Sequence, residues 1–127
     1  MKAKRTALLF AFVLALVVVS PLVAQAETLS WSAPTTYTDG SSIGSATITY
    51  TAVWSTSSSL TSPTTLASSI SGTSTTFNVT TAGMTRGTTI YFGVRATVAG
   101  VNSAYSSALS WLVPTLAPSA PGGLTIQ

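Results

Sequence analysis

From residue 29 onward, apolar and polar residues alternate with a period of two, and the helical spacing of three to four is almost absent. The longest alternating stretches cover residues 48–54 and 90–98, and shorter ones lie at 29–31 and 77–79. Turn-forming residues such as Asp39-Gly40 separate these stretches. The pattern therefore predicts a series of short antiparallel strands.

Within the predicted strands, the alternation assigns side chains to opposite faces. Even-numbered residues from Ile48 to Trp54 face one side, and Val53 with its threonine neighbours faces the other. The inward residues of the longest strand are Ile90, Phe92, Val94, Ala96 and Val98. Leu66 and Ile70 predict a short edge strand, which follows a Ser/Thr/Pro stretch.

The last predicted strand has two possible inward faces. One consists of Ala108, Ser110 and Leu112, and the other of Leu109, Trp111 and Val113. Both end at Pro114, which cannot continue a strand interior. The alternation alone leaves this choice open.

The first residues have the three-part layout of a secretory signal peptide. Basic residues precede an apolar run from Ala7 to Val19, and Ala24-Gln25-Ala26 has the form of a cleavage site. The run of about 13 apolar residues is shorter than the roughly 20 that span a bilayer. We therefore expect cleavage of residues 1–26, and a secreted protein that is extracellular or at the cell surface, with no membrane attachment afterwards.

Cleavage changes the charge of the chain. Three of the five basic residues of the whole chain lie in the expected signal peptide. The remaining Arg86 and Arg95 are balanced by Glu27 and Asp39. A neutral mature chain lacks the electrostatic basis for binding nucleic acid or an anionic membrane.

Side chains suited to catalysis are scarce. The chain has no histidine and no cysteine that would activate a serine or bind zinc. Its carboxylates are Glu27, at the expected new N-terminus, and Asp39, which the following Gly40 marks as a turn residue. The sequence therefore predicts a protein without enzymatic activity, catalytic residues, metal site or cofactor.

Several motifs in order resemble those of fibronectin type III domains: Leu29–Pro34 followed by Asp39-Gly40, then Thr75–Thr80, then Arg86–Ala96. The resemblance implies an all-β, immunoglobulin-like β-sandwich over residues 27–114. One departure is that Ile90 stands where the family's corner tyrosine is expected, with Tyr91 one position out of phase. The loop at residues 100–103 lacks Arg-Gly-Asp, so integrin-type adhesion has no support.

The resemblance also implies a first strand ahead of Trp31, for which the mature chain has no room. A matching pattern, with two prolines followed by Leu124-Thr125-Ile126, instead lies within residues 115–127. The strand that begins at Leu29 would then have a bare edge, which is a template for pairing with another chain. We expect Leu124, Ile126, Leu29 and Trp31 to form a subunit interface.

The geometry of the tail favours donation to a neighbour over self-insertion. In the family topology the last strand ends at the pole opposite to where the first begins. The linker 115–122 reaches roughly 25 Å when extended, and a seven-residue strand is already about 23 Å long. We therefore predict a homo-oligomer that assembles head to tail into a filament, and thus a structural or adhesive protein. A disordered tail, self-insertion, or a fragment of a multidomain fibronectin type III protein are the alternatives.

A second functional hypothesis rests on aromatic residues. Tyr37, Tyr105 and Trp111 are candidates for a surface that binds carbohydrate or a cell-surface protein. The opposing interpretation places the tryptophans in the core or at a subunit contact, because aromatic residues dominate buried area.

Overall fold

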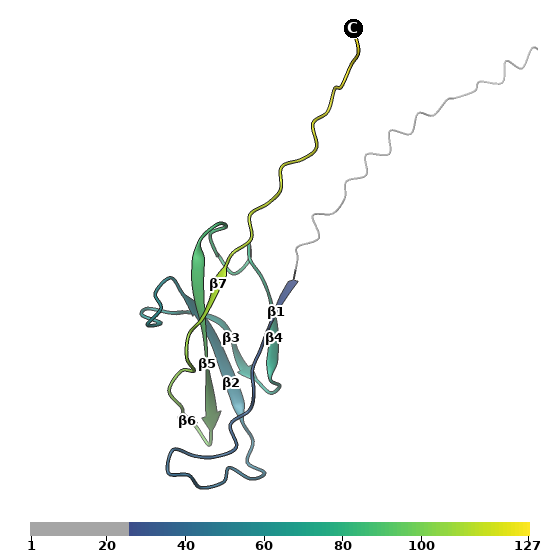
Figure 1. Cartoon of the computed structure of the whole chain (residues 1–127). Helices are drawn as coiled ribbons and strands as arrows, with labels where there is room; N and C mark the ends of the chain where they lie inside the picture. The colour runs from purple at the N-terminus through teal and green to yellow at the C-terminus, as the bar shows by residue number, and fades with distance from the viewer. Residues whose placement is uncertain (1–25) are drawn as a thin grey trace, which may run out of the picture.

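The computed structural model describes residues 26–127, and its regular elements are all strands (Figure 1). The expected signal peptide lies outside the described residues, except for Ala26. Residues 26–127 contain no helix long and apolar enough to cross a membrane. The strands are β1 (Ala26–Ser30), β2 (Thr49–Ser55), β3 (Thr64–Ile70), β4 (Ser74–Asn78), β5 (Thr89–Val98), β6 (Val101–Asn102) and β7 (Leu109–Leu112).

The strands form two antiparallel sheets that face each other. The small sheet pairs β1 with β4, and the large sheet has the order β3-β2-β5-β6, with β7 also paired to β5. Strands β6 and β7 pair with opposite ends of β5, at Thr97–Val98 and at residues 89–92. Together they act as one closing strand that residues 103–108 interrupt. The predicted all-β sandwich is thus confirmed.

Burial follows the predicted alternation on the inner face. Tyr50 and Ala52 on β2, and Ile90 and Phe92 on β5, are buried. The alternation left two possible inward faces for the last strand, and burial decides between them. Val113 is fully buried, whereas Leu112 is 63% exposed. Leu109, Trp111 and Val113 therefore form the inward set.

Aromatic packing joins the two sheets. Phe77 of β4 lies 5.2 Å from Phe92 of β5 and 5.7 Å from Trp111 of β7, measured between ring centroids. Trp31, just after β1, meets Tyr50 of β2 edge-on with centroids 5.3 Å apart. Such pairs stabilise a fold by about 0.5–1.5 kcal/mol beyond the area they bury. The small sheet is thus held by side-chain packing, because the chain has no cysteine.

The outer face of the large sheet is more buried than alternation predicts. Val53 lies on the face opposite to Tyr50 and Ala52, as the alternation predicts, yet it is only 1% exposed, and Ser55 is 4% exposed. The segment between β2 and β3 folds back here: the Ser55 hydroxyl donates to the Thr61 carbonyl at 2.8 Å, and Leu60 packs against Gly93 of β5. A local loop therefore seals this face.

Gly93 leaves room for Leu60, because a Cβ at this position would overlap the end of the Leu60 side chain, which would then have to move. We expect Gly93→Ala to lower the free energy of unfolding by about 1–3 kcal/mol, the usual cost of overpacking. Urea denaturation measures this change. In a Leu60→Ala background the added methyl has space, so the same substitution should cost much less; an equal loss in both backgrounds would refute the packing explanation.

Candidate functional site: an open strand edge

Strand β1 pairs with β4 on one side, and within residues 26–127 no strand pairs with its other side. The backbone N–H of Trp31 donates a hydrogen bond to the Thr73 carbonyl at 2.9 Å, which continues the β1–β4 register. Because antiparallel strands alternate between bonded and non-bonded pairs, Leu29 also points its backbone groups toward β4. The N–H and C=O groups of Thr28 and Ser30 therefore point to the open side.

Three cavities lie one after another between residues 27–43 on one side and residues 96–111 on the other, and we call them together the edge groove. They are named here from the two poles of Figure 1. The base is the pole with loop 31–48 and the β5–β6 turn, and the top is the pole where β1 begins and the tail leaves. The base and middle cavities share Pro34, Ala96 and Ser103 in their linings. The groove is therefore continuous over its lower part.

The top cavity opens directly into the core. It measures about 100 Å³ and lies between Leu29 of β1 and Leu109 and Trp111 of β7, with Phe77 and Phe92 at its floor. Leu109 is 57% exposed although it belongs to the inward set, because nothing in residues 26–127 covers it. Since a cavity of about 150 Å³ holds benzene, this one is of a size to take one aliphatic side chain.

The middle cavity, about 220 Å³, lies beside Trp31, Tyr50 and Tyr105. The Trp31 indole N–H is buried and has no hydrogen-bond partner among the described residues. Such unpaired buried donors are uncommon in folded proteins. Arg95 lies 5.4 Å from the centroid of the Tyr105 ring, a cation–π geometry that holds the tyrosine in place.

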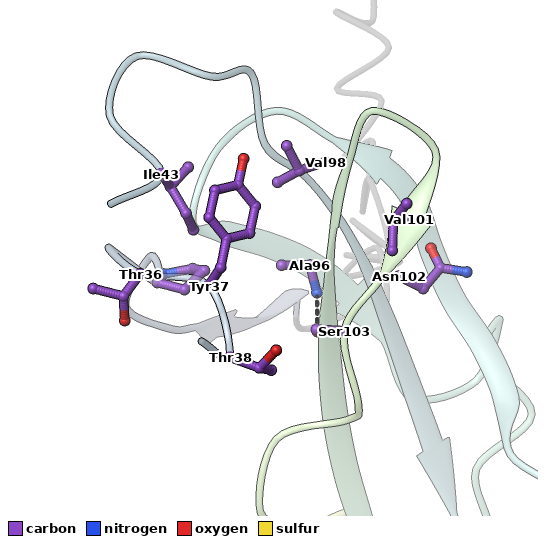
Figure 2. A pocket seen from close by; sticks show the side chains of 10 residues that line it. Thr36, Tyr37, Thr38, Ile43, Ala96, Val98, Val101, Asn102 and Ser103 are labelled. Atoms are coloured by element: carbon purple, nitrogen blue, oxygen red, sulfur yellow. Dashed lines mark hydrogen bonds between the residues drawn. The ribbon is translucent and has the colours of Figure 1, made fainter. Parts of the chain in front are cut away.

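The base cavity, about 200 Å³, is lined by the loop 31–48 and the β5–β6 hairpin, with apolar side chains such as Ile43, Val98 and Val101 beside threonines and Asn102 (Figure 2). Tyr37 forms one wall beside Ile43 and Val98. A small hairpin presents this tyrosine, because the Tyr37 N–H donates to the Ser41 carbonyl at 2.8 Å and Thr36 bridges to Ser42.

Asp39 is the turn residue of this small hairpin. Its Oδ1 accepts hydrogen bonds from the Ser41 hydroxyl at 2.6 Å and from the Ser41 backbone N–H at 2.9 Å. These bonds, the hydroxyl first, hold the pKa of Asp39 below its ordinary value, because they favour the charged carboxylate. The carboxylate therefore shapes the turn, as its pairing with Gly40 predicted.

The structure distributes the predicted site residues along the edge groove and the tail. Leu29 lines the top cavity and Trp31 the middle one. The three candidate binding aromatics divide among the cavities: Tyr37 at the base, Tyr105 in the middle and Trp111 at the top. Trp111 also packs into the core, so it does not stand free on the surface.

The predicted donor residues lie far from the groove. Leu124 and Ile126 are each 99% exposed, in a tail that leaves the top of the sandwich and extends away from it (Figure 1). The last backbone bonds to the domain are those of Val113, with the Thr88 carbonyl and the Gly87 N–H. Sequence reasoning missed Leu109 as a groove residue; its place in the inward set was visible only once the phase of β7 was known.

Among residues 26–127, no three side chains of histidine, cysteine, aspartate or glutamate gather into a metal-binding group.

The edge groove combines backbone groups of β1 that can form hydrogen bonds with neighbouring apolar cavities. These are the features that accept an added strand.

Comparisons with known proteins agree on the fold. An Fn3-like protein from Clostridium thermocellum aligns with 27% identity and a TM-score of 0.51, covering 75% of this chain and 83% of its own. A human fibronectin type III domain aligns with 18% identity and a TM-score of 0.58, covering 78% of this chain and 71% of its own. Another, the fourth such domain of a human protein, has 18% identity, a TM-score of 0.54 and coverages of 78% and 74%.

No protein-family model and no curated protein matches the chain. The structural neighbours nevertheless confirm the resemblance drawn from the motifs, and the sandwich is a fibronectin type III-like domain.

Hydrogen exchange tests the open edge. In a variant without residues 123–127, we expect the Thr28 and Ser30 amides to exchange rapidly, because they face solvent, and the Leu29 amide to be protected by β4. Amide exchange followed by NMR measures the three sites. Equal protection of all three in this variant would show that β1 has a second partner.

Proposed function

We propose that the protein is a secreted, non-enzymatic structural or adhesive component, which assembles head to tail when the C-terminal strand of one copy enters the edge groove of the next. The observation that carries this proposal is the side of β1 with which no strand of residues 26–127 pairs, and which borders cavities that open into the core. The fibronectin type III-like fold supports a non-catalytic role, although folds as such host many functions.

The direction of the strands supports donation to a neighbour. A strand that pairs antiparallel with β1 must enter at the base and run toward the top, since β1 runs from top to base. The tail leaves at the top, so it would have to travel the length of its own domain before entering. A copy stacked above presents its base to the tail, and the strand can enter directly.

Energetics support a stable contact. Burial of Leu124 and Ile126 would each contribute roughly 1.5–3 kcal/mol, and β1 would gain hydrogen bonds for Thr28 and Ser30. The tail carries no charged side chain, and residues 27–127 hold equal numbers of acidic and basic side chains. Little electrostatic repulsion therefore opposes association.

Deletion of residues 123–127 tests the assembly. We expect the secreted wild-type protein to form particles that grow with concentration, and the deleted variant to remain monomeric with an unchanged circular dichroism spectrum. Dynamic light scattering and electron micrographs measure the size.

The double substitution Leu124→Ser and Ile126→Ser should act like the deletion, whereas Thr125→Ser, on the outward face of the donor strand, should leave assembly intact. Unchanged particle size after deletion of residues 123–127 would contradict the proposed assembly.

A second function is favoured by the position of the tyrosines. Tyr37 is 43% exposed, and both Tyr37 and Tyr105 line cavities that open to solvent, as a module binding carbohydrate or protein would require. Saturable binding of a glycan by the deleted, monomeric variant, lost on Tyr37→Ala or Tyr105→Ala, would favour this function. Absence of binding across a glycan array would contradict the carbohydrate-binding function and would not affect the assembly proposal.

A further inference from the structure

The spacing of the residues that line the edge groove matches the spacing of the apolar residues in the tail. The inward residue Leu29 of β1 lies at the top cavity, and Trp31, two residues on and just past the end of β1, lies at the middle cavity. On the tail, Leu124 and Ile126 are also two residues apart, a distance of about 6.6–6.8 Å in a strand. Alternation keeps both pairs on one face.

Antiparallel entry decides which residue meets which cavity. The donor strand runs from base to top, so its later residue lies nearer the top. With one apolar tail residue in each cavity, Ile126 would lie opposite Leu29, at the cavity of about 100 Å³, and Leu124 would lie opposite Trp31. The intervening Thr125 stands opposite Ser30, whose backbone groups point to the open side. This register turns every inward donor residue toward a cavity.

The same register reaches the base of the domain. Pro121 precedes Leu124 by three residues, as Pro34 follows Trp31 by three, so Pro121 comes opposite Pro34. Pro34 lines the base cavity together with Tyr37, and Val101 at its rim is 72% exposed (Figure 2). Proline-rich segments dock into aromatic-lined grooves because their extended conformation is already formed. The base cavity is continuous with the middle one, so a single segment can fill both.

On the basis of the proposed function, we infer that the edge groove of one copy takes residues 118–127 of a second copy in this one register: Pro118–Pro121 in the Tyr37-lined base cavity, Leu124 in the middle and Ile126 at the top. A shift by two residues would keep the alternation, but it would place Ile126 beside Glu27 and leave the middle cavity unfilled. The cavities, more than the backbone pairing, therefore select the register.

Engineered disulfides test the register, because the chain has no cysteine of its own. Directly opposite residues of a bonded antiparallel pair have Cα atoms about 5.5 Å apart, within disulfide reach. We expect Ser30→Cys with Thr125→Cys to give a ladder of covalent oligomers on non-reducing gels. The matched pair Thr28→Cys with Thr125→Cys corresponds to the shifted register, and should give none.

The outcomes separate the inference from the function on which it rests. A ladder from the Thr28 pair, or from neither pair while the wild-type protein still forms particles, overturns the register but leaves assembly standing. A disulfide closed within one monomer overturns both, since it shows self-insertion.

Peptide binding tests the proline seat. The acceptor is the variant without residues 123–127, and the probes are synthetic peptides of residues 118–127 and 122–127. We expect the longer peptide to bind on the order of tenfold more tightly, from the apolar contacts of the base cavity, and Tyr37→Ala to remove that difference. Equal affinities for the two peptides would overturn the role of the base cavity.

Discussion

The backbone of a buried strand must be paired on both sides or reach water, and this requirement governs the architecture around β1. Within residues 26–127 the small sheet consists of β1 and β4 alone, so its hold on the large sheet depends on the side chains of Leu29, Phe77 and Trp31. The chain has no cysteine to form a disulfide, so beyond the β1–β4 backbone pairing the small sheet gains its stability from packing. Within residues 26–127 its free side is where backbone groups of β1 remain without a paired strand.

The strands were largely predictable because alternation records burial directly. Residues of β2 and β5 showed it most clearly, since both strands lie in the middle of the large sheet. The phase of β7 was not predictable, because Leu109 and Leu112 are both exposed and both apolar. Burial of Val53 was hidden for another reason. The loop between β2 and β3 brings Leu60 against Gly93, the β5 partner of Val53, and the path of this loop, with Leu60 at a positive φ of 55°, is not encoded by local alternation.

The candidate site could be predicted in part. The bare edge at Leu29 and Trp31 followed from comparing the order of the motifs with the fibronectin type III pattern. The cavities could not, because they arise from the interruption of the closing strand at residues 103–108, which leaves Leu109 and Tyr105 on the rim. The base cavity likewise depends on a small hairpin around Asp39 that positions Tyr37, a tertiary relation between a turn and a distant strand.

The direction in which the tail leaves the domain has a mechanical consequence. It emerges along the strand axis at the top pole, so in the proposed assembly tension between stacked copies would pull a donated strand lengthwise against β1. Hydrogen bonds of an antiparallel pair stand perpendicular to the strands. Such a load would stretch them all at once in shear, instead of peeling them apart one after another, and a thread of these domains would resist stretching far better than the modest size of each contact suggests.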